Sequence, residues 1–147
     1  MRIAIGSDHG GLDLKTAIKA FLTEHGHTVT DHGTHSRDSV DYPDYAQAVG
    51  RDIRNGTADY GVLICTTGLG ICMAANKQPG IRAAVLHNED AARFSRTHNG
   101  CNCACYGQKY HTPYMAQRTL EIFLSATFEG GRHERRIAKL EAAAHCG

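Results

Sequence analysis

Short apolar runs alternate with amphipathic stretches along the whole chain, and this alternation constrains the fold more than any other feature of the sequence. It is typical of βαβ units wound around a parallel sheet. Because the central runs are nearly continuous in apolar residues, helices should cover both faces of that sheet. The expected strands are residues 2–7, 27–32, 60–65, 81–87 and 102–107. The expected helices are about 11–24, 43–55, 68–77, 89–97 and 112–126. The sequence thus predicts an α/β fold with a five-stranded parallel sheet.

The length of 147 residues, with 41% in the hydrophobic set, suits one domain over residues 1–147. Sixteen Lys and Arg against fifteen Asp and Glu give a net charge of +1, which provides no broad cationic field for nucleic acid or an anionic membrane. No stretch approaches the roughly 18 apolar residues of a spanning helix, and the first residues reach a polar turn too soon for a signal peptide. We expect a cytoplasmic protein that binds neither nucleic acid nor membrane.

A last expected helix, at about 131–144, follows another helix with no strand between them. It therefore has no obvious place over the sheet of its own chain. Its apolar residues Ile137, Leu140 and Ala144 form one stripe that must be covered. We expect a partner subunit to cover it, and hence a homodimer. The sequence leaves open whether dimers pair further into tetramers.

The chain has six cysteines, and we expect all of them to be free thiols, because a domain of this size needs no disulfide staples. Three of them, Cys101, Cys103 and Cys105, alternate near the last expected strand, with His98 and His111 close by. Alternation places the thiols on one face of a strand, too far apart for one tetrahedral ion. We therefore expect small buried residues and no metal. Zinc binding or thiol redox chemistry is the alternative.

In open parallel sheets, ligands bind beyond the carboxyl ends of the strands. The most informative segment there is Cys65-Thr66-Thr67-Gly68-Leu69-Gly70, which leaves a buried strand and starts a helix. Backbone N–H groups at a helix start favour an anion, but the segment matches neither the Walker nor the dinucleotide-binding pattern. Cys65 stands beside this positive pole, which favours a thiolate acting as base or nucleophile. The alternative is an inert buried cysteine.

Two polar pairs lie near other strand ends. Asp8 and His9 follow the first strand, and pairing of that strand with the third would bring them next to Cys65. There they can move hydroxyl protons or bind an anion, although Asp8 alone also fits a plain helix N-cap. His98 and Asn99 end a helix before the last strand, where one can donate a proton and the other orient a hydroxyl.

Arg132 and Arg136 lie four residues apart on the last expected helix. Both guanidinium groups therefore project from one face and can converge on one phosphate. The alternative is a solvated basic face.

Six motifs occur together and in order: SDHGG near the start, DYPDYA at 41–46, CTTGLG at 65–70, AANKQPGIRAA at 74–84, THN at 97–99 and EGGRHERR at 129–136. Together they resemble the ribose-5-phosphate isomerase B family and its sister isomerases for allose and galactose 6-phosphates. The resemblance implies a Rossmann-like, three-layer α/β/α fold without metal or organic cofactor. It also implies a homodimer whose two active sites are built from both subunits.

The resemblance assigns a role to each candidate residue. Cys65 matches the family's proton-abstracting base, and His98 matches the acid that opens the sugar ring. The remaining matches are Asp8 and His9 for substrate contacts, Thr66, Thr67, Gly68, Leu69 and Gly70 for the loop around the enediolate oxygens, Asn99 for a hydroxyl, Arg132 and Arg136 for the phosphate, and Tyr42 at the border of the site. The implied reaction interconverts ribose 5-phosphate and ribulose 5-phosphate through a cis-enediolate. During ring opening Asp8 accepts the proton of the anomeric hydroxyl, and the Thr67 hydroxyl helps to stabilise the enediolate.

Two positions depart from the family pattern. Thr66 replaces the first glycine of the usual Cys-Gly-Thr-Gly. Lys109, which we expect to contact the phosphate, stands where the family commonly has an arginine, so that charge is kept but the planar fork is lost. Both departures keep other substrates open, namely a tetrulose 4-phosphate or a hexose 6-phosphate. A non-catalytic phosphosugar-binding domain is the alternative from another class.

Overall fold

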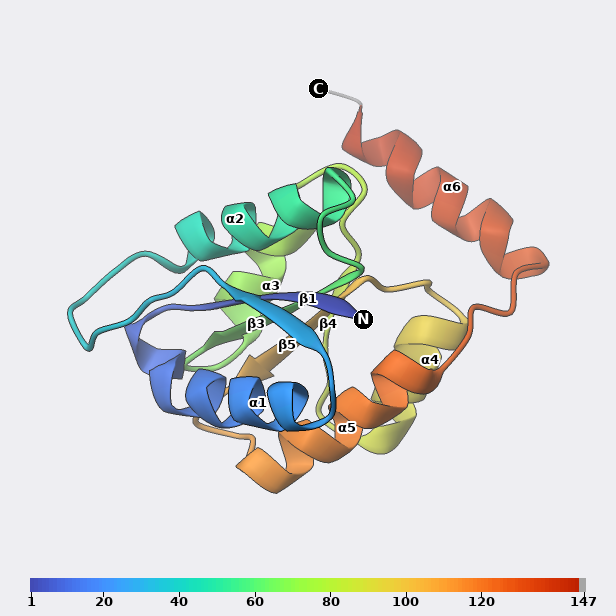
Figure 1. Cartoon of the computed structure of the whole chain (residues 1–147). Coiled ribbons are helices and arrows are strands. Elements are labelled where there is room, and N and C mark those ends of the chain that lie inside the picture. Colours follow the sequence, from blue (N-terminus) through green and yellow to red (C-terminus); the bar gives the residue numbers. More distant parts are fainter. Residues whose placement is uncertain (146–147) are drawn as a thin grey trace.

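Five parallel strands form one sheet in the order β2-β1-β3-β5-β4 (Figure 1). The computed structural model describes residues 1–145, so Cys146 of the expected thiols lies outside the described residues. The strands are β1 (Arg2–Ser7), β2 (Thr28–Asp31), β3 (Tyr60–Cys65), β4 (Ala83–Val85) and β5 (Cys103–Gly107). The five-stranded parallel sheet is therefore confirmed. The edge strands β2 and β4 are shorter than expected, since an edge strand has a hydrogen-bonding partner on one side only.

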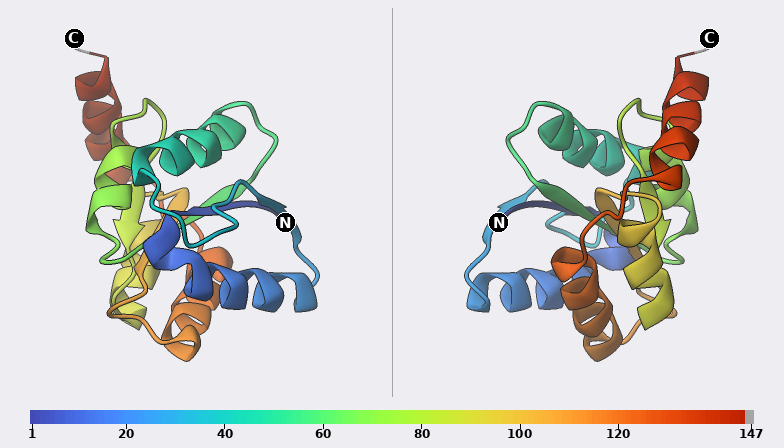
Figure 2. Two further views of the ribbon diagram at one scale, coloured as in Figure 1. Left: turned by 90° about the vertical axis from the view of Figure 1, so that its left-hand side faces the viewer. Right: turned by 90° about the vertical axis from the view of Figure 1, so that its right-hand side faces the viewer.

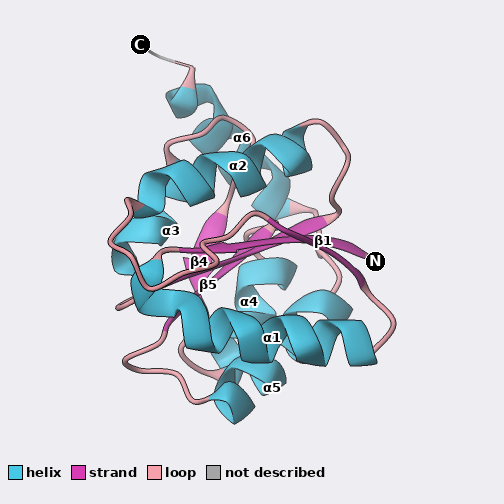
Figure 3. Cartoon of the chain, turned by 60° about the vertical axis from the view of Figure 1, so that its left-hand side comes forward, coloured by secondary structure: helices cyan, strands magenta, loops and turns pink. Residues whose placement is uncertain are grey.

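Helices cover both faces of the sheet, as Figure 3 shows. The helices are α1 (Leu12–Glu24), α2 (Tyr42–Arg54), α3 (Leu69–Asn76), α4 (Glu89–Thr97), α5 (Pro113–Ser125) and α6 (Arg132–Ala144), with a short 3-10 helix η1 (His9–Gly11) before α1. One face of the sheet packs against α1, α4 and α5, and the other packs against α2 and α3. None of these helices has the length and apolarity that crossing a bilayer would demand.

Side chains alternate between the two cores, as the pleat of a strand requires. In β3, Val62 and Ile64 face α1 and α5, whereas Leu63 and Cys65 face α2 and α3. This alternation corrects one expectation: Cys103 and Cys105 face the α2–α3 core, but Cys101 precedes β5 and packs in the opposite core.

The cysteines near β5 have the character of buried apolar residues. Burial raises the pKa of Cys101 to about 12. Hydrogen bonding with Cys103 and Cys72, together with burial, raises the pKa of Cys105 well above its usual value. These thiols therefore stay protonated near neutral pH, which agrees with a packing role.

Helix α6 projects away from the layers and is attached to them along one side (Figures 1 and 2). Of the predicted stripe, Ile137 is half-buried, whereas Leu140 and Ala144 are exposed. The stripe thus remains largely uncovered within the described chain. The homodimer that would cover it stays a prediction.

A buried ion pair joins α1 to the end of β2. Lys15 Nζ lies 2.7 Å from Asp31 Oδ1, with 3% and 9% of the side chains exposed. The same carboxylate accepts hydrogen bonds from Gly33 N at 2.9 Å and Lys19 Nζ at 3.1 Å. Burial alone would raise the pKa of Asp31, but these hydrogen bonds, led by that from Lys15, outweigh it and the pKa is lowered.

Replacement of Asp31 by Asn should destabilise the fold, because it leaves the Lys15 ammonium buried without a countercharge. We expect the free energy of unfolding at pH 7 to fall by about 3–5 kcal/mol in urea denaturation. A carboxylate with a lowered pKa stabilises the fold above its unfolded pKa and loses this effect as the pH falls through its folded pKa. The difference between the native chain and Asp31→Asn should therefore shrink below roughly pH 4.

The matched control is Asp13→Asn, because Asp13 pairs with Arg37 at the surface, where the side chains are 58% and 72% exposed. Surface pairs contribute little, so this variant should unfold like the native chain. Equal losses in the two variants would show that the Lys15–Asp31 pair does not stabilise the fold.

Candidate active site

The pairing of β1 with β3 brings two of the predicted segments together at the carboxyl edge of the sheet. Ser7 lies beside Ile64 in the strand register, and Asp8 N donates to Ile64 O at 3.3 Å. A hollow of about 480 Å³ opens beside this junction. Its lining includes Asp8, His9, Val40, Asp41 and Tyr42.

Cys65 ends β3 directly below the start of α3. Its side chain is buried, with 4% exposed, and its Sγ accepts a hydrogen bond from Gly68 N at 3.1 Å. Gly68 reaches this position with a φ of 82°, which glycine adopts without strain. An N–H group aimed at sulfur, at the positive end of a helix, favours negative charge on that sulfur. The geometry therefore suits a thiolate.

Close backbone approaches hold the loop from Thr66 to Gly70 in place. A Cβ on Gly107 would lie 2.3 Å from the carbonyl carbon of Thr67, so only glycine lets the loop pass there. Lys109 N donates to Thr66 O at 3.0 Å. A Cβ on Gly70 would lie 2.6 Å from Tyr42 Cζ, which shows that the Tyr42 ring lies against this loop.

The side chains of this loop differ in direction. The Thr67 hydroxyl accepts a hydrogen bond from Leu69 N at 3.3 Å, whereas the Leu69 side chain is 57% exposed. Thr66 turns its hydroxyl toward η1 and stands directly against Gly10. The Lys109 ammonium lies 5.8 Å from the ring centroid of Tyr110. Lys109 is therefore tied to the loop by its backbone, while its charge lies over the neighbouring aromatic ring.

Asp8 both caps a helix and lines the hollow. Its Oδ1 accepts from Gly10 N at 3.0 Å, so the N-cap alternative is correct, but the same residue borders the cavity. Burial raises the pKa of Asp8, against the opposing effect of His9 and of the N–H groups of Gly10 and Gly11. His9 Nδ1 accepts from Val40 N at 3.2 Å, which places the proton of the neutral ring on Nε2.

The other predicted site residues lie at the opposite edge of the sheet. His98 is the C-cap of α4, so His98 and Asn99 precede β5, whereas Cys65 lies beside Gly107 at its far end. Five strand residues span ~13 Å between the first and last Cα atoms. Figure 1 shows α4 and α6 on the right and the start of α1 on the left. One chain therefore does not bring His98 and Cys65 together.

His98 sits in a stack of rings. Its ring centroid lies 4.3 Å from that of His133, with 13° between the planes, and 4.7 Å from that of Phe94. Glu129 Oε2 lies 3.8 Å from His98 Nε2 and 3.7 Å from His133 Nε2. Burial, aided by the charges of His98 and Arg132, lowers the pKa of His133. A carboxylate thus lies within ion-pair distance of the Nε2 atoms of both rings.

Sequence reasoning missed Glu129 and His133 as parts of this arrangement, although both belong to the EGGRHERR motif. Within residues 1–145 these two residues and His98 are the group of potential metal ligands whose donor atoms lie within 4.8 Å of one another. However, because the His98 and His133 rings are nearly parallel, the lone pairs of their nitrogens point in nearly the same direction and do not converge on one metal position. The arrangement therefore suits the orientation of His98 better than tetrahedral coordination.

The two predicted phosphate ligands share the first turns of α6. Arg132 and Arg136 are exposed and form no ion pair within residues 1–145. Both guanidinium groups are therefore free to bind an anion. They lie on the same edge of the sheet as His98, not beside Cys65.

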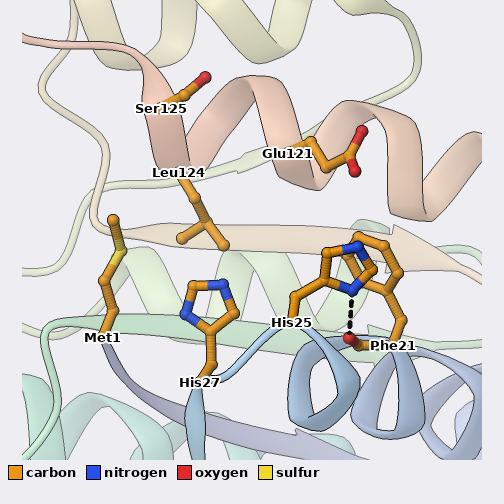
Figure 4. A pocket seen from close by; sticks show the side chains of 7 residues that line it. All are labelled: Met1, Phe21, His25, His27, Glu121, Leu124 and Ser125. Carbon is orange, nitrogen blue, oxygen red and sulfur yellow. Dashed lines mark hydrogen bonds between the residues drawn. The ribbon is translucent and has the colours of Figure 1, made fainter.

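A second hollow, of about 230 Å³, lies at the amino ends of β1 and β2 (Figure 4). Its walls are mostly apolar, and His25 stacks on Phe21 with a centroid distance of 4.2 Å. Its lining residues are Met1, Phe21, His25, His27, Glu121, Leu124 and Ser125. None of them belongs to the predicted site, whereas Asp8, His9 and Tyr42 of that site line the hollow at the carboxyl edge of the sheet, which is therefore the candidate active site.

Comparison with known proteins gives matches along nearly the whole chain. The sequence model of the Ribose/Galactose Isomerase family matches residues 3–140. The chain is 43% identical to ribose-5-phosphate isomerase B of Escherichia coli (strain K12), over 96% of this chain and 95% of that protein.

Solved structures match equally well. Ribose-5-phosphate isomerase B of Clostridium thermocellum superposes with a TM-score of 0.96 and 47% identity, over 97% of both chains. The enzyme of Mycoplasma genitalium, solved with bound ribulose-5-phosphate, gives a TM-score of 0.93 and 40% identity, over 99% of this chain and 97% of that one. The three-layer α/β/α fold expected from the resemblance is confirmed.

The contact between Gly10 and Thr66 can be tested by a double-mutant cycle. A Cβ on Gly10 would lie 2.0 Å from Thr66 Oγ1, so Gly10→Ala should lower the free energy of unfolding by about 1–3 kcal/mol. In a Thr66→Gly background, which removes that side chain, the same substitution should cost much less. Urea denaturation of the four chains measures the difference. Equal costs in both backgrounds would show that the two loops do not touch.

Proposed function

Since the chain belongs to the ribose/galactose isomerase family, we propose that it interconverts an aldose phosphate and its ketose, with ribose 5-phosphate and ribulose 5-phosphate as the substrate pair. One observation carries this proposal. The Cys65 sulfur accepts a hydrogen bond from Gly68 N at the start of a helix, on the same edge of the sheet as the hollow lined by Asp8 and His9. A thiolate at a site rich in N–H donors suits removal of a proton from carbon, followed by storage of the charge on oxygen.

The first step is ring opening. His98 protonates the ring oxygen while Asp8 accepts the proton of the anomeric hydroxyl. The raised pKa of Asp8 supports this role, because it makes the carboxylate a stronger base than an exposed aspartate. The Glu129 carboxylate near His98 Nε2 supports the acid role, because it stabilises the protonated ring.

The second step is proton transfer between carbons. The Cys65 thiolate removes the proton from C2, which leaves a cis-enediolate, and the proton returns to C1. The N–H groups from Thr66 to Gly70 and the Thr67 hydroxyl stabilise the negative oxygens. The loss of one such donor typically costs about 3–4 kcal/mol of transition-state stabilisation, so the fixed loop contributes much of the rate.

We further propose that each active site is shared between two copies of the chain. Each chain presents Cys65 at one edge of its sheet and His98 at the other, so each holds two half-sites that do not meet. A two-fold related copy would place its His98, Asn99, Arg132 and Arg136 over the Cys65 hollow, and two equal sites would result. Uncovered Leu140 on α6 and Met73 on α3, 57% and 63% exposed, support such an interface.

The arginines hold the substrate at its remote end. Two guanidinium groups on one helix face bind one phosphate with charge-assisted hydrogen bonds. The binding energy of the phosphate then fixes the reacting carbons relative to Cys65. No organic cofactor or metal ion is required by this chemistry.

Substrate length is the open choice within this reaction class. The M. genitalium enzyme solved with ribulose-5-phosphate favours five carbons. Thr66 directs its hydroxyl toward Gly10, so this departure from the family pattern changes the packing of two loops and not only the surface of the hollow. Turnover across four-, five- and six-carbon sugar phosphates decides between the pentose and the tetrulose or hexose alternatives.

Replacement of Cys65 by Ala should abolish exchange of the C2 hydrogen with deuterated solvent and lower kcat by about 10²–10⁴-fold, because the base is lost. Proton NMR of the sugar phosphate measures the exchange. The matched control is Cys72→Ala on α3, which should retain turnover. If exchange in Cys65→Ala continues at the native rate, Cys65 is not the base. A native chain that binds phosphate without any exchange would support the non-catalytic alternative.

Shared sites predict complementation between two inactive chains. Cys65→Ala and His98→Asn chains, each nearly inactive alone, are co-expressed in equal amounts and purified together. Random pairing makes half of the dimers hybrid, and each hybrid contains one intact and one doubly damaged site. The mixture should therefore recover about 25% of native activity. No recovery in demonstrated hybrid dimers would show that both residues act within one chain.

A further inference from the structure

The motif AANKQPGIRAA at 74–84 has no role in the proposed chemistry, yet its side chains make a dense set of contacts. Asn76 Nδ2 donates to Ala83 O at 2.9 Å, and Ala83 N donates to Asn76 Oδ1 at 2.8 Å. Asn102 Oδ1 accepts from Arg82 N at 2.9 Å, and its Nδ2 donates to Gly80 O at 2.8 Å. These bonds fix the segment from Gly80 to Ala83 against α3 and the start of β5.

The Arg82 guanidinium connects this segment to two separate elements. Its Nε donates to Asn99 O at 3.1 Å, and its Nη2 donates to Gly100 O at 2.9 Å. Its Nη1 forms an ion pair with Glu141 Oε1 on α6 at 2.5 Å. Glu141 Oε2 also accepts from Gly80 N at 3.0 Å. One side chain thus joins the loop that carries His98 and Asn99 to the helix that carries the arginines.

Helix α6 is attached to the same loop at its other end. There the His133 ring stacks on His98, and Glu129 N, just before the helix, donates to Thr97 O at 3.0 Å. His133 and Glu141 are eight positions apart along the helix, a rise of ~12 Å. Attachment at two points that far apart sets the angle of the helix as well as its position.

Apolar packing adds one contact region to this attachment: Ile137 of α6 is half-buried, and a Cβ on Gly100 would lie 3.4 Å from its Cδ1. Between the two points, a hollow of about 420 Å³ separates α6 from the rest of the chain, lined in part by Arg82, Gly100, Phe128 and Ile137. A further hollow of about 220 Å³ lies next to Glu141. The polar contacts of Arg82 and Glu141 cross this partly open region and therefore help to set the angle of α6.

We propose that Arg82 and Glu141 are positioning residues, which hold the Arg132–Arg136 phosphate clamp at a fixed distance from His98 and Asn99. This proposal rests on the proposed function. Neither residue touches the substrate. Their effect is to present the ring-opening acid and the phosphate clamp as one unit, so that a substrate held by its phosphate has its ring oxygen at His98.

The test compares Glu141→Ala with Glu141→Gln. Loss of the carboxylate should let α6 tilt, so KM for ribose 5-phosphate and the inhibition constant of inorganic phosphate should both rise roughly tenfold in Glu141→Ala, while kcat changes less. Gln keeps an acceptor for Gly80 N and Arg82, so it should restore most of the affinity. The matched control is Lys139→Ala, an exposed change on the same helix, which should leave both constants unchanged.

A purely structural role predicts a different pattern. Loss of folded protein lowers the apparent kcat in proportion and leaves KM and the phosphate inhibition constant of the remaining enzyme unchanged, and that result would overturn the proposal. Adding Glu141→Ala to Arg82→Met should weaken phosphate binding no further than Arg82→Met alone, because both changes break one link. Full additivity would likewise overturn it.

Calorimetry with inorganic phosphate separates this proposal from the proposed function. Arg136→Ala serves as the reference for a broken clamp. If the native chain turns over no sugar phosphate but binds phosphate, and Glu141→Ala weakens that binding as Arg136→Ala does, the proposed function fails while the positioning role stands. If Arg136→Ala weakens phosphate binding and Glu141→Ala does not, or if the native chain binds no phosphate, the positioning role fails.

Discussion

The parallel pairing of β1 with β3 is the constraint on which the candidate site depends. It sets Ser7 beside Ile64, so the chain leaves both strands at the same edge and Asp8 lies next to the Cys65 loop. The site is therefore built on backbone hydrogen bonds of two buried strands. Glycines at the crossing points, above all Gly107 under Thr67, let the loops approach to a distance that no other residue allows.

The elements and the pairing of the first strand with the third could be predicted from the sequence. Contacts between side chains of distant segments could not. The sheet, the helices and the placement of Asp8 near Cys65 required only apolar periodicity and the topology of parallel sheets. Cys101 was assigned to the wrong face because alternation holds only within a strand, and β5 begins at Cys103. The stack of His133 on His98 had no signal in periodicity, since it joins the end of one helix to the start of another.

The separation of Cys65 from His98 is a consequence of the fold. In a parallel sheet, every strand starts at one edge and ends at the other, so a residue before β5 and a residue after β3 lie a strand length apart. A reaction that needs both side chains at one substrate therefore needs two copies of the chain. If each site is shared as proposed, the half-site of each copy must be positioned before the copies meet, because correcting a misplaced helix would cost binding energy.

This requirement explains why α6 is fixed by charge and hydrogen bonds. Under the proposed shared site, Leu140 on α6 is left uncovered for a second copy, so the same surface is not also buried against its own chain. Arg82 and Glu141 attach the helix by an ion pair while Leu140 stays 57% exposed. A guanidinium also has enough donors to hold two backbone carbonyls and a carboxylate at once. Lysine at position 82 has the charge but no planar fork, so it would hold α6 without fixing the angle between the helix and the His98 loop.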